Sequence, residues 1–175
     1  MNEKYLEVVG LDFCQEMLDY CDSKLPKQNN VQTIKADALS MPFENNYFSA
    51  ATVSFGVRNF ENLENGIKEI YRVLEDGAEL RILEFGRPYF PVSVTYDIYS
   101  KYIMPLLGQA LTKNKEAYTY LPETAKNFPY ANSFCEILRK QGFKDVSYKA
   151  LTFGIAYMYS ASTVSYTHLT LPTKA

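Results

Sequence analysis

The sequence predicts an α/β fold: an open, mostly parallel sheet with an antiparallel hairpin at its C-terminal end. A short apolar run, residues 8–11, ends at the carboxylate of Asp12, which is typical of a strand in a ligand-binding parallel sheet. Further apolar runs alternate with segments of helical periodicity, as in such sheets. Residues 146–150 and 155–159 instead alternate apolar with polar side chains and predict two antiparallel strands.

The strand–helix alternation is clearest in the first half of the chain. Apolar side chains recur at helical spacing over residues 14–25 and 63–74, and Pro26 and Gly77 follow these segments as breakers. The expected strands are residues 7–12, 31–36, 50–55 and 80–85.

The second half is richer in aromatic side chains. Residues 92–113 are apolar, and we expect a helix kinked at Pro105. Ser133 and Glu136 have the spacing of a capping box, which predicts a helix capped by Ser133 and ended by Gly142.

One expected feature of a nucleotide-binding sheet is not found. A glycine-rich turn normally lies about 20 residues upstream of an acid such as Asp12. Only eleven residues precede Asp12, and their one glycine, Gly10, lies inside the strand. We therefore expect the first strand and the glycine-rich loop to be missing.

The chain is expected to form one partial domain over residues 1–162. Residues 163–175 continue no pattern, and we expect a tail that is disordered or a translation artefact. This tail holds His168, the only histidine, to which we assign no role.

Composition excludes several classes of function. The net charge of −2 provides no basic face for nucleic acid. No apolar run approaches the ~20 residues of a membrane span, and no signal peptide is recognised. The chain has three cysteines, no C-x-x-C pair and one histidine, which argues against a metal site. We expect the cysteines to be buried, reduced thiols of a cytoplasmic protein.

Ligands of open α/β sheets bind beyond the carboxyl ends of the strands, so the residues there are candidates for a site. Asp12 offers two acceptor oxygens to a ribose, or it caps the helix that starts near Cys14. Asp37 and the backbone N–H of Ala38 suit an adenine, or they form a turn. Ser54 lies near the end of the third strand.

A second group of candidates follows the third strand. Arg58 beside Asn59 could stabilise a developing oxyanion, although a surface arginine in a turn is the simpler interpretation. Glu84 could face a ligand, but we favour an edge charge. Residues 89–120 could line a pocket for a lipid-like substrate, but we favour helix core.

These candidates lie within a longer series of strings. In order they are Val9-Gly10-Leu11-Asp12, Ala36-Asp37-Ala38, Met41-Pro42-Phe43, Ser54-Phe55-Gly56-Val57-Arg58-Asn59, Tyr71-Arg72-Val73-Leu74, Leu83-Glu84-Phe85, Tyr118-Thr119-Tyr120-Leu121 and Gly142-Phe143. The series resembles the C-methyltransferases of menaquinone and ubiquinone biosynthesis, which are class I S-adenosylmethionine-dependent enzymes with a Rossmann-like sheet. The likeness runs from about residue 5 to residue 160. It departs from the family at Glu75-Asp76-Gly77-Ala78, where a basic residue, proline and two glycines are usual.

The resemblance implies a cofactor, S-adenosyl-L-methionine, and a reaction, methylation of a polyprenyl quinol ring. Asp12 would bind the ribose, Asp37 and Ala38 the adenine, and Ser54 would lie near the methionine part. Arg58 and Asn59 would face the quinol as the catalytic pair. The quinol is membrane-resident, which implies peripheral contact at the inner face of the membrane and no metal.

Two other functions remain open at this point. Asp12 would suit the ribose of a nicotinamide cofactor in a Rossmann oxidoreductase equally well. The aromatic stretch would suit a quinone- or lipid-binding domain without catalysis. A chain without the first strand is expected to bind its cofactor weakly and to form homo-oligomers or aggregates.

Overall fold

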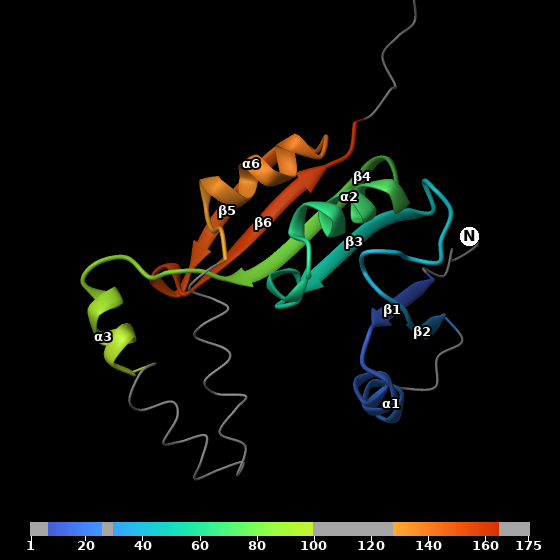
Figure 1. Ribbon diagram of the computed structural model, residues 1–175, viewed down its shortest axis with the longest axis horizontal. Helices are drawn as coiled ribbons and strands as arrows, with labels where there is room; N and C mark the ends of the chain where they lie inside the picture. The colour runs from blue at the N-terminus through green and yellow to red at the C-terminus, as the bar shows by residue number, and fades with distance from the viewer. Residues whose placement is uncertain (1–6, 26–29, 100–127, 165–175) are drawn as a thin grey trace, which may run out of the picture.

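The computed structural model describes residues 7–25, 30–99 and 128–164. Helices separate β1 from β2 and β3 from β4, β3 follows β2 directly, and two strands follow α6 (Figure 1). The strands are β1 (Val8–Asp12), β2 (Val31–Lys35), β3 (Phe48–Ser54), β4 (Leu74–Phe85), β5 (Lys144–Leu151) and β6 (Ala156–Ser162). The helices are α1 (Gln15–Lys24), α2 (Leu63–Val73), α3 (Val92–Ile98) and α6 (Asn132–Lys140), with 3-10 turns η1 (Val57–Asn59) and η3 (Thr152–Gly154).

The strands form a mixed arrangement of two sheets. β1 and β2 pair in parallel, and the four-stranded sheet has the order β3-β4-β6-β5. β3 runs parallel to β4, whereas β6 is antiparallel to both β4 and β5. The predicted α/β alternation and the C-terminal antiparallel hairpin are therefore confirmed.

The two sheets are not joined by backbone hydrogen bonds. Within the part of the chain that the structure describes, β1 pairs only with β2 and β3 only with β4. Figure 1 shows β1 and β2 beyond the β3 edge of the larger sheet. One edge each of β1 and β3 thus has no strand partner among these residues.

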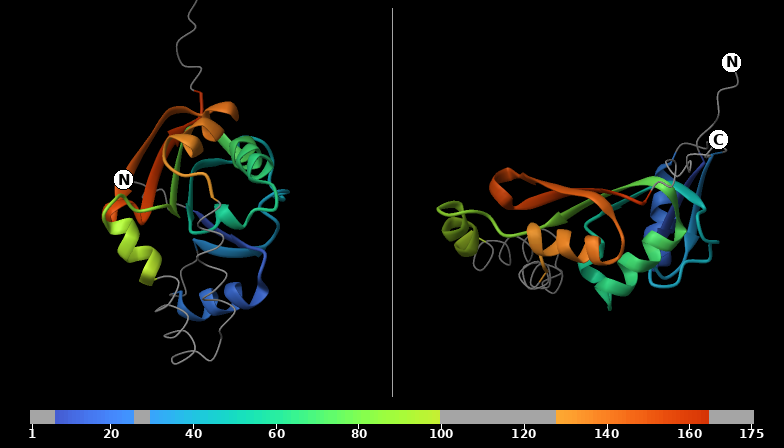
Figure 2. Two further views of the ribbon diagram at one scale, coloured as in Figure 1. Left: turned by 60° about the vertical axis from the view of Figure 1, so that its left-hand side comes forward. Right: turned by 90° about the horizontal axis from the view of Figure 1, so that it is seen from above.

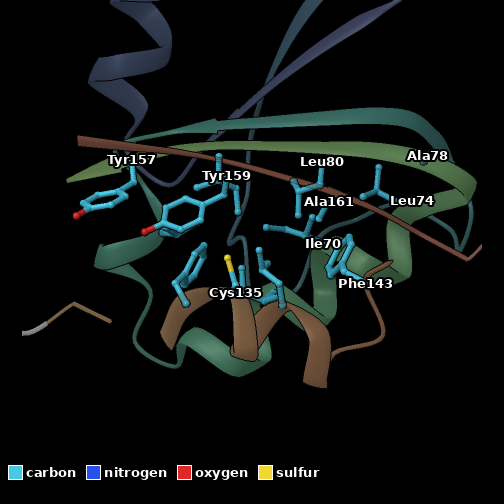
Figure 3. Packing of buried hydrophobic residues seen from close by; sticks show 14 of the residues in the cluster. Ile70, Leu74, Ala78, Leu80, Cys135, Phe143, Tyr157, Tyr159 and Ala161 are labelled. Carbon is cyan, nitrogen blue, oxygen red and sulfur yellow. The ribbon is translucent and has the colours of Figure 1, made fainter. Parts of the chain in front are cut away.

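The hydrophobic core lies between the four-stranded sheet and two helices. Figure 2 shows α2 and α6 on the same face of this sheet. Side chains of β4 and β6 point toward them, among them Leu80, Tyr157 and Tyr159 (Figure 3). Ile67 of α2 and Leu138 of α6 are fully buried against this face. The alternation in β6, with Tyr157 and Tyr159 inside and Met158 outside, is that of a strand covered on one side.

The start of α6 differs from the prediction. The capping residue is Ala131, without a side-chain cap, so Ser133 lies inside the helix and the capping box was wrong. Ala131 has a φ of 52°, and its N–H donates to the hydroxyl of Tyr159 at 2.9 Å. A tertiary contact therefore holds the chain where the helix begins. At the other end, Gly142 has a φ of 103° and ends the helix as predicted.

Most predicted boundaries agree with the structure to within two residues. β3 begins at Phe48 rather than residue 50, with a register irregularity before Ala50. β4 begins at Leu74 rather than residue 80, so Gly77, the expected breaker, lies inside this strand. α3 ends at Ile98, and the remainder of the helix expected over residues 92–113, with Pro105 and the tyrosine-rich loop, lies outside the described residues.

Two further expectations need correction. Thr163 is 4% exposed, its N–H donates to Ala78 O, and its Oγ1 accepts the N–H of Ala78. The fold therefore continues past residue 162.

Cys135 is buried, but Cys14 is half-buried and Cys21 exposed, because α1 presents little of its surface to the core. Among the described residues, no helix is long and apolar enough to cross a membrane.

Candidate functional site

The two acidic side chains predicted to bind the cofactor lie at neighbouring strand ends. Asp12 is the last residue of β1 and pairs in register with Lys35, the last residue of β2. The carbonyl of Asp12 accepts the N–H of Ala36 at 3.1 Å, and Asp37 follows directly. The structure therefore brings Asp12 and the Asp37–Ala38 turn together at the carboxyl edge of one sheet.

Each of these carboxylates also holds its own turn. Oδ1 of Asp12 accepts the N–H of Cys14 at 2.8 Å, just before α1. Oδ1 of Asp37 accepts the N–H of Leu39 at 2.8 Å. The N-cap of α1 is Cys14, without a side-chain cap, so Asp12 holds the turn ahead of the helix and does not cap it. The turn interpretation of Asp37 is correct. Both bonds use Oδ1, and both residues are exposed, so each carboxylate keeps acceptor capacity for a ligand.

An ion pair that the sequence analysis did not single out holds the loop after Asp37. Glu69 and Arg72, one turn apart on α2, are joined by Arg72 Nη2–Glu69 Oε1 at 2.7 Å. Arg72 also donates to the carbonyls of Met41 and Phe43, and Glu69 accepts the N–H of Met41. The hydrogen bonds from Arg72 lower the pKa of Glu69, and the same contact raises the pKa of Arg72.

The sequence shows the spacing of Glu69 and Arg72, but it does not show which loop the pair contacts. Glu and Arg three apart on a helix face one another in any helix. The carbonyls that Arg72 meets belong to a loop 29 and 31 residues earlier in the chain. Only the packing of α2 beside this loop shows the connection.

The second group of candidates lies where β3 and β4 end together. Ser54 closes β3 and pairs in register with Leu83 of β4. Phe55 follows with a φ of 56°, a conformation that bulky residues rarely adopt, and its N–H donates to Leu83 O at 2.8 Å. The rings of Phe55 and Phe85 lie 4.4 Å apart between centroids. After this strained turn, the chain of η1, which carries Arg58 and Asn59, runs back toward β4.

Arg58 and Glu84 form a buried ion pair at this edge. Arg58 Nη1 lies 2.7 Å from Glu84 Oε1, and the side chains are 9% and 0% exposed. Glu84 also accepts the backbone N–H groups of Arg58 and Phe85. The expectation of an edge charge at Glu84 was therefore wrong: β4 is central in its sheet, and Glu84 alternates along it with Leu80 and Ile82 on the buried face. Arg58 is not the surface arginine of the simpler interpretation either.

Arg58 is incompletely satisfied by the protein. Its Nη1 also donates to the carbonyl of Phe55, and its Cζ lies 5.2 Å from the ring centroid of Phe85. Its Nε is buried and has no hydrogen-bond partner among the described residues. Asn59, its neighbour on η1, is exposed.

A tyrosine cluster lies beside the ends of β4 and β6. The ring of Tyr157 fills the space where Gly86 lacks a Cβ, since an added Cβ would lie 2.3 Å from it. Tyr130 lies 5.8 Å away and Tyr148 5.7 Å away between ring centroids. Burial raises the pKa of Tyr157 and of Tyr159, so both phenols stay neutral. Within the described ranges, no three His, Cys, Asp or Glu side chains gather closely enough to hold a metal ion.

A family model described as the ubiE/COQ5 methyltransferase family matches residues 1–163. The chain belongs to the ubiE/COQ5 methyltransferase family. The family match runs through Thr163, in agreement with its burial. None of these similarities supports a nicotinamide-dependent oxidoreductase or a non-catalytic binding domain.

Curated relatives within this family carry two names. The chain is 39% identical over 160 residues to a demethylmenaquinone methyltransferase of Bacteroides fragilis, covering 89% of the chain and 65% of the relative. It is 36% identical to a demethylmenaquinone methyltransferase of Porphyromonas gingivalis, covering 87% and 64%. It is 37% identical to the mitochondrial 2-methoxy-6-polyprenyl-1,4-benzoquinol methylase of Caenorhabditis elegans, covering 87% and 55%. The chain thus spans less than two thirds of the lengths of these relatives.

Solved structures of methyltransferases share the fold. One is a putative methyltransferase of Haloferax volcanii, in complex with its Trm112 activator, with a TM-score of 0.67, 12% identity and coverage of 90% of this chain and 72% of that one. Another is a phosphoethanolamine N-methyltransferase of Haemonchus contortus in complex with S-adenosylhomocysteine, with a TM-score of 0.66, 15% identity and coverage of 91% and 44%. The α/β sheet is therefore that of the class I S-adenosylmethionine-dependent methyltransferases.

Proposed function

We propose that this protein transfers a methyl group from S-adenosyl-L-methionine to a ring carbon of a polyprenyl quinol. The observation that carries the proposal is the family match over residues 1–163, and the acids Asp12 and Asp37 at neighbouring strand ends support it. The names of the relatives in Bacteroides fragilis and Caenorhabditis elegans support two substrates of one class, a demethylmenaquinol and a methoxy-polyprenyl-benzoquinol.

The residues at the strand ends fit the cofactor by their donor and acceptor chemistry. Asp12, exposed at the end of β1, would accept from the ribose hydroxyls, and Asp37 from the adenine amine. The N–H of Ala38 would donate to a ring nitrogen of the adenine, and Ser54 would lie near the methionine part. When bound, S-adenosylmethionine supplies an electrophilic methyl group.

The contribution of Arg58 would be to stabilise the ionised quinol oxygen. An aromatic carbon is nucleophilic when the neighbouring phenol is ionised, and a preorganised donor near that oxygen favours the ionised form. Arg58 has such a donor in its buried Nε, and Asn59 beside it has an amide that can donate as well. The ring of Phe85 covers the guanidinium, and the side chain of Arg58 is only 9% exposed, so little water reaches it.

We further propose that the protein works at the inner, cytoplasmic face of the membrane that holds the quinol. Phe90 is 83% exposed and Phe153 70% exposed, and the two loops that carry them are joined by the bond from Tyr89 N–H to Phe153 O. Exposed aromatic side chains of this kind are suited to a membrane interface. Figure 1 shows both loops at the end of the molecule that carries α3.

Two experiments test these proposals. The purified protein is incubated anaerobically with methyl-labelled S-adenosylmethionine and short-chain forms of the two quinols, and we expect label in the ring of at least one. Binding of S-adenosylhomocysteine without transfer to either quinol would contradict the proposed reaction.

For the membrane contact, Phe90→Ser with Phe153→Ser should reduce co-sedimentation with phosphatidylethanolamine–phosphatidylglycerol vesicles. Equal co-sedimentation of both proteins would contradict it.

A further inference from the structure

Glu84 is the most deeply buried charged residue that the structure describes. It is 0% exposed at the end of β4, where three N–H groups meet it: Nη1 of Arg58, the backbone of Arg58 and the backbone of Phe85. Removing two charges from water is so costly that well-packed apolar residues often replace a buried pair without loss of stability. Stability alone therefore gives a weak reason for this pair.

The geometry of Arg58 suggests a different reason. Glu84 and the carbonyl of Phe55 both accept from Nη1, and the guanidinium lies over the ring of Phe85 with Cζ 5.2 Å from its centroid. Two of these contacts hold the guanidinium at Nη1, and the ring of Phe85 covers one of its faces. Nε remains buried and has no acceptor among the described residues. A buried donor left without a partner is destabilising, and a purely structural pair would avoid it.

We propose that Glu84 is a positioning residue, which holds the guanidinium of Arg58 so that its Nε–H is directed to the oxygen of the aromatic substrate. The proposal rests on the proposed function, since the substrate oxygen is that of the quinol. Because the pair is neutral as a whole, Arg58 contributes a directed hydrogen bond more than a net charge. No bond is made or broken at Glu84, and no proton leaves Arg58.

Substitutions that keep a charge pair in the protein interior can test this role. Glu84→Asp keeps the carboxylate but withdraws it by one methylene, and Arg58→Lys keeps the cation but has no Nε–H. We expect Glu84→Asp to lower kcat by roughly 10-fold or more when Arg58 is present, since small misplacements of catalytic groups are costly. In the Arg58→Lys protein the same change should lower kcat by less than about twofold, because the donor that Glu84 directs is absent. KM for the quinol and the affinity for S-adenosylhomocysteine should stay within about twofold throughout.

A matched control lies on the same strand. Glu79 pairs with Arg81 at 2.9 Å, but these side chains are 63% and 49% exposed. Glu79→Asp should leave kcat unchanged. If Glu84→Asp instead lowers kcat equally in the wild-type and Arg58→Lys backgrounds, in proportion to a loss of thermal stability, Glu84 is structural and the proposal is overturned.

A spectroscopic measurement distinguishes this proposal from the proposed function. The Nε–H resonance of Arg58 in ¹⁵N-arginine-labelled protein should be protected from solvent exchange, and Glu84→Asp should reduce this protection at least 10-fold. An unchanged resonance in Glu84→Asp would overturn the positioning role, whatever the activity. Reduced protection in a protein that binds S-adenosylhomocysteine but methylates neither quinol would contradict the proposed function and still support the positioning of Arg58 by Glu84.

Discussion

Arg72 and Glu69 form a two-bond ion pair on α2, with Arg72 Nε 2.8 Å from Glu69 Oε2 and Arg72 Nη2 2.7 Å from Glu69 Oε1. The remaining donors of Arg72 reach the carbonyls of Met41 and Phe43, at 3.1 and 2.8 Å. One pair on a helix therefore fixes the loop that follows the Asp37–Ala38 turn.

Replacing Arg72 by lysine should loosen this loop. Lysine cannot reproduce the planar fork that reaches a carboxylate and two carbonyls together. We expect Arg72→Lys to lower the free energy of unfolding and to weaken S-adenosylhomocysteine binding. Urea unfolding and calorimetric titration measure the two effects. Arg81→Lys, in an exposed pair, is the control; equal results for the two variants would contradict a special role for Arg72.

The same pair predicts a pH dependence of stability. The pKa of Glu69 is lowered in the folded protein by its hydrogen bonds from Arg72. A lowered folded-state pKa contributes stability that is present above the unfolded value, near pH 4.3, and is lost as the pH falls through the folded value. The difference in Tm between the wild type and Glu69→Gln should therefore be largest at about pH 6–7 and shrink below about pH 4. A difference that stays constant down to about pH 3 would show that the charge of Glu69 contributes nothing.

Asp12 has two roles that substitutions can separate. Asp12→Asn keeps an oxygen for the N–H of Cys14 but loses the charge, whereas Asp12→Ala loses both. We expect both variants to weaken S-adenosylhomocysteine binding by roughly 1–3 kcal/mol, and only Asp12→Ala to lower Tm as well. Calorimetry and thermal unfolding report the two effects. Wild-type affinity in Asp12→Asn would assign Asp12 to the turn alone.

Thr163 should contribute to the stability of the fold, although the sequence analysis assigned it to the tail. Its hydroxyl accepts from Ala78 N and donates to Glu75 O, so Thr163→Val leaves both backbone groups unpaired. We expect a loss of about 1–3 kcal/mol in urea unfolding. Truncation after residue 162 should lower Tm more than truncation after residue 164 does. Ser162→Ala, at a neighbouring hydroxyl that bonds the exposed Asp145, serves as control. Equal Tm values for the two truncations would show that Thr163 is dispensable.

The unpaired edges of β1 and β3 should cause self-association. Within the described residues each of these strands has one partner, and the sheet face opposite α2 and α6 exposes Met158 by 40%. Open edges and uncovered apolar faces favour pairing between chains. We expect the 175-residue chain to form dimers or larger species in size-exclusion chromatography with light scattering. Ala50→Lys on β3 should reduce this association, and a monomeric wild type would contradict the expectation.

The sequence by itself determined the order of elements and most of their limits. Helix α2 and the strand ends at Asp12 and Ser54 could be predicted, because apolar periodicity is a local property of the chain. The family motifs also identified the class of fold. The candidate residues Asp12 and Asp37 were predicted as strand-end acids, and the pairing of β1 with β2 brings these strand ends together.

Only the tertiary structure decided what these residues contact. Glu84 could not be recognised as a buried partner of Arg58, because Arg58 lies on a turn 26 residues earlier in the chain. The start of α6 depends on the hydroxyl of Tyr159, 28 residues away from Ala131. The limit of the fold at Thr163 depends on a hydrogen bond to Ala78, 85 residues earlier. Contacts over such separations leave no periodic signal, since they arise from packing between elements rather than from the order of neighbouring residues.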